Sequence, residues 1–279
     1  MPTRFAPSPT GLLHLGHAFS AITAWNISQK TDKKFILRIE DIDLQRCKVE
    51  YEKQIFDDLE WLGLTWEKPV IRQKNRFNFY QKAIDILNNK NLIYPCSCTR
   101  KDIAEALSAP QGNKIPKPYP GLCRNRSMSE LKNEDNIRIN IDKSINYLKN
   151  IKLKSLSFVD NYYQENLFNI SFASKHLQED IIVARKDIGT SYHLSVVVDD
   201  AFQNITHVVR GADLFNSTPI QRLLQELLEL PQPLYHHHRL ILDEDGKRLA
   251  KREASTALSI LRESGVKPIE LKRSLDLIN

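Results

Sequence analysis

The stretch that most constrains the fold is RFAPSPTGLLHLGH, residues 4–17. Arg4, Phe5 and Ala6 have the character of a strand end. The prolines and glycine after them set a tight turn, because proline fixes φ and glycine accepts unusual backbone angles. From about Gly16 the chain can continue as a helix. We therefore predict a strand, a turn and a helix in succession, with unpaired helix N–H groups that attract an anion such as a phosphate.

The next segments alternate between helix and strand patterns. A helix is expected from about Leu15 to Lys30, and the apolar run FILRI at residues 35–39 is typical of a buried strand. Two more helices are indicated by apolar residues at helical spacing, namely Ile55, Phe56, Leu59 and Leu62 in the first and Phe77, Tyr80, Ile84 and Leu87 in the second. Strands that alternate with helices predict a parallel sheet.

The pattern is interrupted in the middle of the chain. Residues 108–126 form a Pro/Gly-rich stretch, and the patterning stays weak to about Lys175. Buried strands are then expected at Val196–Val198 and Val208–Val209. A sheet that is split by an insertion and then resumed explains this order.

The segment STPIQRLLQELLEL predicts a helix with a clear start. Thr218 is expected as its N-cap, Pro219 as its first helical residue and Gln221 as the partner that completes a capping box.

The charge balance favours a polyanionic partner. The 279 residues carry 40 Lys+Arg against 34 Asp+Glu, a formal charge of +6, which is compatible with binding nucleic acid. No run approaches the ~18 apolar residues of a membrane span, and the N-terminus lacks the apolar core of a signal peptide. Four cysteines, three of them in one short window, fit a reducing compartment and a metal site better than a disulfide scaffold. We expect a cytoplasmic protein with no membrane partner.

Two histidines stand three residues apart at the start of the first helix. His14 and His17 can both face an anion at the helix end, although such a pair by itself is more often a surface or packed pair. The basic segment DGKRLAKR, residues 245–252, adds Lys251, which can reach the same phosphates. Two distant basic elements around one anion site favour the functional interpretation.

These motifs resemble those of the class I aminoacyl-tRNA synthetases, and within them the glutamyl branch. HLGH at residues 14–17 is similar to the HIGH motif, and RLAKR at residues 248–252 is similar to the KMSKS loop. Arg248 stands in place of the first lysine and Ala250 in place of the serine, so Lys251 is expected to carry the contact to ATP. The resemblance implies a Rossmann catalytic domain that activates an amino acid with ATP and Mg²⁺.

The resemblance also implies the chemistry. A substrate carboxylate attacks the α-phosphorus of ATP, and pyrophosphate leaves. His14 and His17 are expected to hydrogen-bond the phosphate oxygens, while Lys251 neutralises the departing pyrophosphate, so these three residues are both catalytic and ATP-binding.

A pocket for glutamate needs a cation to hold the side-chain carboxylate. Arg4 and Arg210 are the candidates, Glu40 can meet the α-ammonium group, and Tyr192 can donate its hydroxyl. Without the resemblance, Glu40 also fits a surface carboxylate. The set that the resemblance implies for glutamate is Arg4, Phe5, Ala6, Pro7, Ser8, Glu40, Tyr192 and Arg210.

The expected insertion holds a candidate zinc element. Cys96, Cys98 and Cys123 offer three thiolates, and Tyr119 can complete a tetrahedral zinc site if the metal lowers the pKa of its phenol. The spacing of Tyr119 and Cys123 matches the Tyr-x-x-x-Cys zinc element of the family, which implies one structural zinc. The tract His236–His238 is a rival source of ligands, which we interpret as structural or close to the phosphates.

The acceptor is predicted from the short segment after the basic loop. Only 27 residues stand after Arg252, whereas synthetases that charge the tRNA 3′ end normally carry an anticodon-binding domain there. The chain resembles a truncated branch of the family that attaches glutamate to queuosine in the anticodon of tRNA(Asp). The expected partners are therefore L-glutamate, ATP and tRNA(Asp) carrying queuosine, and the chain is expected to be a monomer.

Other functions remain open from the sequence. The chain is alternatively a minimal glutamyl-tRNA synthetase, a nucleotidyltransferase of the HxGH type or a catalytically silent RNA-binding relative.

The predicted fold class is α/β, with a Rossmann-type doubly wound parallel sheet split by an insertion that carries a zinc element. We expect the first half of the catalytic domain at residues 1–94, the insertion at 95–180 and the second half at 181–235. Residues 236–279 then hold the KMSKS-like loop and a short helical tail, without an anticodon-binding domain.

Overall fold

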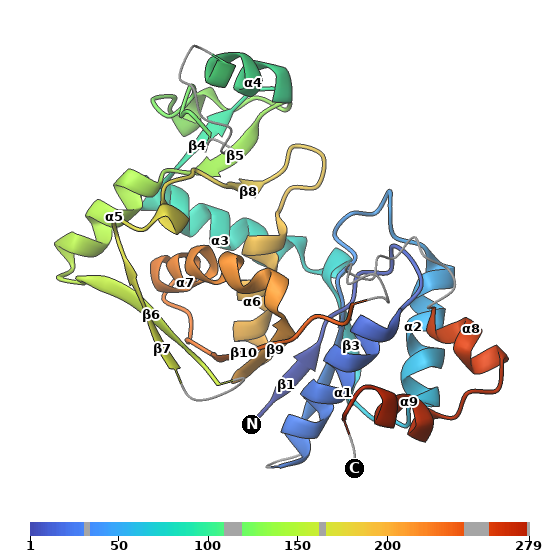
Figure 1. The fold of residues 1–279 in the computed structure, drawn as a ribbon. Coiled ribbons are helices and arrows are strands. Elements are labelled where there is room, and N and C mark those ends of the chain that lie inside the picture. Colours follow the sequence, from blue (N-terminus) through green and yellow to red (C-terminus); the bar gives the residue numbers. More distant parts are fainter. Residues whose placement is uncertain (31–33, 109–118, 162–165, 243–256, 278–279) are drawn as a thin grey trace.

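The structure, a computed structural model, describes residues 1–30, 34–108, 119–161, 166–242 and 257–277. Figure 1 shows a large sheet flanked by helices, with a smaller sheet at one end of the molecule and the last helices beside α2, away from that smaller sheet.

The large sheet has the order β3-β2-β1-β9-β10-β6-β7. Its strands are β1 (Thr3–Phe5), β2 (Phe35–Ile39), β3 (Glu67–Arg72), β6 (Ser155–Asp160), β7 (Asn166–Ser171), β9 (His207–Gly211) and β10 (Leu234–His238). All neighbours pair in parallel except β6 and β7, which are antiparallel. The order reverses between β1 and β9, so the carboxyl ends of these two strands flank the crevice where doubly wound sheets bind ligands. The predicted fold class is confirmed.

Helices cover both faces of the large sheet. They are α1 (Leu15–Gln29), α2 (Val49–Trp61), α3 (Phe77–Asn89), α6 (Tyr192–Phe202) and α7 (Thr218–Leu227). Successive strand residues point to opposite faces: Val208 packs in the core that holds α3, α6 and α7, whereas Val209 packs in the core that holds α1 and α2. The two faces of β9 therefore join two separate hydrophobic cores. The helices and strand predicted between residues 15 and 89 are confirmed.

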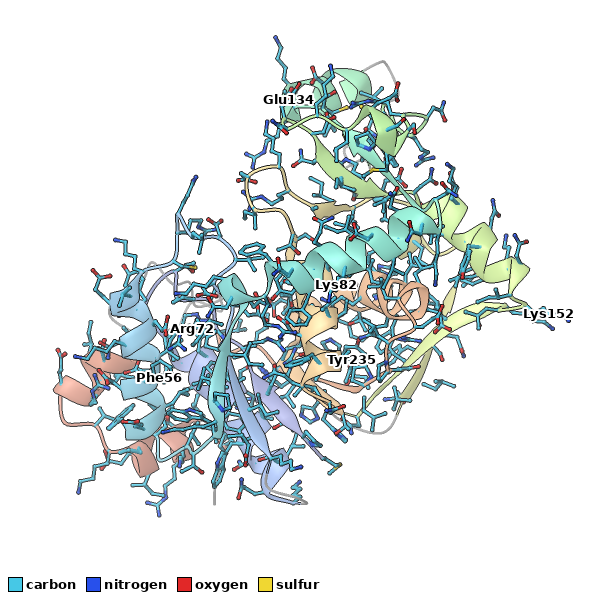
Figure 2. All side chains as sticks on the ribbon, turned by 180° about the vertical axis from the view of Figure 1, so that it is seen from behind. Phe56, Arg72, Lys82, Glu134, Lys152 and Tyr235 are labelled. Atoms are coloured by element: carbon cyan, nitrogen blue, oxygen red, sulfur yellow. The ribbon has the colours of Figure 1, made fainter. Side chains whose placement is uncertain are left out.

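The smaller sheet is antiparallel, with the order β4-β5-β8. Its strands are β4 (Ile93–Cys96), β5 (Asn136–Ile139) and β8 (Ile182–Ala184), accompanied by α4 (Arg100–Ser108) and α5 (Ile141–Asn150). Seen from behind, Glu134 lies at this end of the molecule and Tyr235 lies in the interior of the larger part (Figure 2). Strands β6 and β7 fall within residues 95–180 but pair with the large sheet through β10. The domain boundaries expected from the sequence stay a prediction.

Two predictions for the second half of the chain are wrong, one for Val196–Val198 and one for the start of α7. Val196–Val198 belong to helix α6 rather than to a strand. The Ser191 hydroxyl caps this helix by accepting the N–H of Leu194, and α6 packs against α3 and α7. Burial between two helices outweighs the small preference of valine for strands, which is worth less than about 1 kcal/mol per residue.

The start of α7 differs by one residue from the prediction. Ser217 is its N-cap, without a side-chain cap hydrogen bond, and Thr218 is already helical, with Pro219 in the first turn. The side chains of Thr218 and Gln221 instead accept hydrogen bonds from the Arg210 guanidinium. The predicted capping box is therefore absent from this helix start.

The chain ends in two short helices, α8 (Leu258–Glu263) and α9 (Pro268–Ser274), and α8 packs against α2. Short 3₁₀ turns span Gln73–Asn75, Met128–Glu130, Lys175–Leu177 and Ala212–Ser217. In the part of the chain that the structure describes, no helix combines the length and the apolar character that crossing a membrane requires.

Candidate active site

A cavity of about 270 Å³ opens at the carboxyl ends of β1 and β9. Its walls come from these strand ends, the turn after β1, the start of α1 and α6, and the segment after β10. Every residue predicted to contact glutamate lines it, together with His14 and His17. The fold therefore gathers side chains more than 200 positions apart in the sequence at the switch point of the sheet.

The two histidines cap helix α1. His14 is the N-cap, and its Nδ1 accepts the N–H of Gly16 at 3.1 Å, while Nδ1 of His17 accepts the N–H of His14 at 3.1 Å. A neutral imidazole that accepts through Nδ1 carries its proton on Nε2. Each ring can therefore donate an Nε2–H to an anion in the cavity. Gly16 leaves room for the His14 ring, since a Cβ atom at this position would lie 3.0 Å from it.

The side chain of Arg4 is held in place by the buried carboxylate of Asp200. Its Nε donates to Asp200 at 3.1 Å, and Arg38 donates to the same Asp200 oxygen at 2.7 Å and to Glu40 at 3.1 Å. Burial by itself would raise the pKa of Asp200, but the two guanidinium groups outweigh it and hold the pKa below its usual value. For Glu40 burial dominates, and the pKa is raised despite Arg38. Sequence reasoning missed Arg38 and Asp200, which join the cationic and anionic sides of the cavity.

Arg210 differs from Arg4 because its partners are neutral. Its guanidinium donates to His237 at 3.0 Å, to Gln221 at 2.7 Å and to Thr218 at 2.8 Å. Within the described residues no carboxylate lies in ion-pair range of it, and the residue is only 5% exposed. A buried cation without a counter-ion is costly. The arrangement suits an anionic ligand in the cavity.

Further residues line the cavity, and of these Ser20 and Asp213 were not predicted. Ser20 and His238 line it and contact each other at 2.5 Å between the hydroxyl and Nε2, and Asp213 also lines it. His238 was expected only as part of the His236–His238 tract, which does not come together with the cysteines as a ligand cluster among the described residues.

Lys251 lies outside the described residues. The two described flanks of its segment both reach the cavity region: Ile241 lines the cavity, and Ala257 forms a β-bridge with His14. The N–H of Leu258 also donates to the carbonyl of Leu13.

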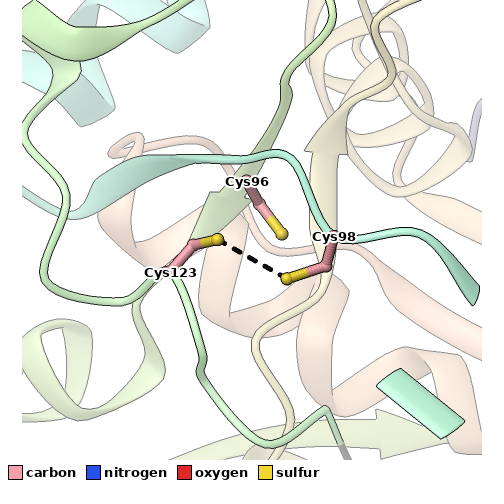
Figure 3. Close-up of side chains that lie close together, drawn as sticks. All are labelled: Cys96, Cys98 and Cys123. Carbon is pink, nitrogen blue, oxygen red and sulfur yellow. Dashed lines mark hydrogen bonds between the residues drawn. The ribbon is translucent and has the colours of Figure 1, made fainter. Parts of the chain in front are cut away.

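The predicted cysteines come together on the smaller sheet (Figure 3). The Sγ atoms of Cys96, Cys98 and Cys123 all lie within 4.8 Å of one another, and those of Cys98 and Cys123 are 3.5 Å apart. The Tyr119 hydroxyl lies 3.2 Å from the Cys96 sulfur and 3.4 Å from that of Cys98. Tetrahedral zinc with Zn–S bonds of about 2.3 Å keeps its sulfurs roughly 3.8 Å apart. The donor set fits zinc.

The surroundings of the cluster favour the thiolate form at Cys123 but disfavour it at Cys98. Buried Arg138 donates to the Cys96 sulfur at 3.3 Å and stacks 3.8 Å from the centre of the Tyr119 ring. Burial would raise the pKa of Cys123, but hydrogen bonds from Ser97 and neighbouring groups lower it to about 7. For Cys98 burial prevails and raises the pKa to about 12. A bound cation would favour the thiolate form of both.

The comparisons with known proteins agree with this geometry. The family described as "tRNA synthetases class I (E and Q), catalytic domain" matches residues 1–278. A "Glutamyl-Q tRNA(Asp) synthetase" from Rhodobacter capsulatus is 44% identical over 99% of this chain and 100% of the relative. A "Glutamate–tRNA ligase" from Prochlorococcus marinus is 36% identical over 95% of this chain and 55% of the relative.

A solved structure has the same fold. The glutamate tRNA ligase from Elizabethkingia meningosepticum, in complex with its amino acid, superposes with a TM-score of 0.72 at 27% identity, over 91% of this chain and 52% of that one. This chain spans about half the length of both glutamate–tRNA ligases. The family and the ligase class predicted from the motifs are confirmed: the chain belongs to the class I tRNA synthetases for glutamate and glutamine, through their catalytic domain.

Proposed function

We propose that this chain activates L-glutamate with ATP and transfers the glutamyl group to queuosine in the anticodon of tRNA(Asp). The observation that carries the proposal is the buried guanidinium of Arg210, which has only neutral partners among the described residues and lines the same cavity as His14 and His17. A cationic group that can bind a carboxylate lies in one cavity with two hydrogen-bond donors for phosphate. This combination suits an acidic amino acid that reacts with a nucleotide.

In this proposal the amino acid is held by charge. Arg210 and Arg4 bind its carboxylate groups, Glu40 accepts from the α-ammonium group, and the Tyr192 hydroxyl donates to the substrate. The backbone of residues 5–8, which form the end of β1 and the turn after it, borders the bound glutamate. Because Arg4 is already neutralised by Asp200, we assign the stronger attraction for a substrate carboxylate to Arg210.

The nucleotide is held by hydrogen-bond donors. The Nε2–H groups of His14 and His17 donate to phosphate oxygens of ATP, whose negative charge increases as the substrate carboxylate attacks the α-phosphorus. Lys251 neutralises the leaving pyrophosphate, and Mg²⁺, when bound with ATP, shields the phosphates. Removing one such donor typically slows the reaction by roughly 10²–10³-fold.

The acceptor is proposed from the relatives and from charge. The Rhodobacter relative, which matches over its full length, is named for glutamyl-Q and tRNA(Asp), and the +6 charge favours contact with the phosphates of an RNA. In the transfer step a hydroxyl of the acceptor attacks the carbonyl carbon of glutamyl-adenylate, AMP leaves, and the hydroxyl proton is released.

The cysteine cluster completes the proposal. Cys96, Cys98, Cys123 and Tyr119 hold one zinc ion, which is structural because four protein ligands leave no position for water. We place the protein in the cytoplasm as a monomer, with the domain boundaries expected from the sequence.

Glutamate-dependent ATP–pyrophosphate exchange tests the activation step. We expect exchange with L-glutamate and at least tenfold less with L-glutamine or L-aspartate. Glutamine leaves the buried charge of Arg210 unpaired, and the shorter side chain of aspartate loses hydrogen bonds to it. Exchange that is equal for all three amino acids, or absent with and without tRNA, would contradict the proposal.

A further inference from the structure

We infer that Asp160 and His237 position Arg210, fixing the direction in which its guanidinium meets the substrate. The inference rests on the proposed function, in which Arg210 receives a carboxylate of glutamate. Neither residue lines the cavity, so both act through Arg210 rather than on the substrate.

The three residues lie on three adjacent parallel strands, β6, β10 and β9. The register pairs Tyr235 with Asp160 and His237 with Arg210, which places the side chains of Asp160, His237 and Arg210 on one face of the sheet, where close polar contacts join them in a row. Asp160 Oδ2 lies 2.5 Å from Nδ1 of His237, and Asp160 Oδ1 accepts the backbone N–H of His237 at 3.3 Å. On the other side of the ring, Nε2 lies 3.0 Å from Nε of Arg210.

This row fixes the proton on one side of the imidazole. A carboxylate at Nδ1 requires an N–H there, so Nε2 of the neutral ring is an acceptor, in contact with the Arg210 Nε–H and 3.2 Å from the Thr218 hydroxyl. Burial, with the nearby charge of Arg210, lowers the pKa of His237 although Asp160 opposes this, which agrees with a neutral ring. A protonated ring would have no acceptor for Arg210.

Aromatic side chains prevent the ring from turning. The His237 ring stacks on Tyr235 with an interplanar angle of 3° and a centroid distance of 5.7 Å. Phe215 contacts the same ring edge-on at 5.2 Å, and Phe158 does so at 6.5 Å. Both Asp160 and His237 are less than 10% exposed. The lone pair of His237 Nε2 therefore points in one fixed direction.

These contacts fix the orientation of the Arg210 guanidinium. Of its five N–H groups, Nε–H goes to His237, one on Nη1 goes to Gln221 and one on Nη2 goes to Thr218. One N–H remains on each terminal nitrogen, and Arg210 lines the cavity. Two such donors match the two oxygens of a carboxylate.

A histidine suits this position better than an acid would. A carboxylate in direct contact with Arg210 would form an ion pair and reduce its attraction for the substrate. The imidazole supplies the acceptor while it keeps the charge of Asp160 one ring away. The pair orients Arg210 without neutralising it.

The test compares His237→Leu with His237→Gln, since glutamine can supply an acceptor and leucine cannot. His236→Gln is the matched control, because His236 stands next in the same strand and contacts Asn161 instead. KM values for glutamate and ATP come from pyrophosphate exchange, and glutamate affinity comes from calorimetry without ATP.

We expect His237→Leu and Asp160→Asn to raise the glutamate KM and Kd roughly tenfold or more, with the ATP KM changed less than about twofold. His237→Gln should recover most of the affinity, and His236→Gln should resemble wild type. Equal shifts for both substrates, or no recovery with glutamine in a folded variant, overturn the inference. If His237→Leu does not fold, Asp160→Asn and His237→Gln still decide it. Wild type without glutamate-dependent exchange contradicts the proposed function instead.

Discussion

Asp200 and Arg38 form a buried ion pair, 2.7 Å long, that connects the two charged sides of the candidate active site. Asp200 also pairs with Arg4, and Arg38 also pairs with Glu40. The cation and the anion that face the cavity thus share one buried framework.

Asp200→Asn should destabilise the protein by about 3 kcal/mol or more, because it leaves two buried guanidinium groups without their shared carboxylate. Urea unfolding measures the change. Asp142→Asn is the control, since Asp142 pairs with Arg124 at the surface and should cost less than about 1 kcal/mol. Similar losses in the two variants would show that Asp200 is not the centre of this framework.

Arg210→Lys should raise the KM for glutamate by roughly 10–100-fold and leave the KM for ATP nearly unchanged. Lysine keeps the charge but loses the planar fork, and hydrogen bonds to a charged group are worth about 1.5–3 kcal/mol. Arg222→Lys is a suitable control, because Arg222 is also buried but donates to Ser157 and Gln225 away from the cavity. Parallel shifts in both KM values would remove Arg210 from the amino-acid pocket.

Cys98→Ser and Cys123→Ser should each lower the bound zinc to well below one ion per chain and reduce stability, since structural zinc contributes directly to folding. The ATP KM should not change, because the cluster lies on the smaller sheet and outside the cavity. Metal analysis of the purified variants measures the outcome, with Cys47→Ser as the control that retains zinc. Full metal content in both variants would refute the zinc site.

Asp58 should give the stability a pH dependence. It lies under α8, where it accepts hydrogen bonds from Arg262 and Gln54, and burial raises its pKa from 3.8 to about 6. Between about pH 4 and pH 6 the folded chain holds a proton on Asp58 that the unfolded chain has lost. The contribution of Asp58 to stability is therefore complete below pH 4 and is lost as the pH rises through 6.

Urea unfolding of wild type and Asp58→Asn at pH 4 to 7 measures this dependence. The wild-type free energy of unfolding should fall relative to the variant by an amount on the order of 2 kcal/mol across this range. Glu60→Gln, on the exposed side of the same helix, should show no such trend. A difference between wild type and Asp58→Asn that is constant with pH would contradict the raised pKa.

Much of the fold could be predicted because local patterns and burial agree there. The strand at Phe35–Ile39 is a short, mostly apolar run, and the helix at Leu15–Gln29 follows a turn rich in proline and glycine, so both are marked in the sequence itself. The strand predicted at Val196–Val198 was wrong because these valines are buried by α3 and α7, which lie elsewhere in the sequence. The predicted N-cap role of Thr218 was wrong because its hydroxyl accepts a hydrogen bond from Arg210 on β9 instead.

The site was predictable to the extent that it depends on motifs. His14, Arg4 and Glu40 line one cavity, as expected. The sequence did not reveal Arg38 and Asp200, which lie 162 positions apart and meet only where helix α6, which carries Asp200, packs against strand β2, which carries Arg38.

The acceptor is the central claim, and its most direct test uses radiolabelled glutamate with tRNA(Asp) that contains or lacks queuosine, each with and without the 3′ terminal adenosine. We predict glutamate incorporation into queuosine-containing tRNA(Asp) whether or not the terminal adenosine is present, and none when queuosine is absent. Incorporation that requires the terminal adenosine and a glutamate-specific tRNA would contradict the account and identify a synthetase that charges the tRNA 3′ end.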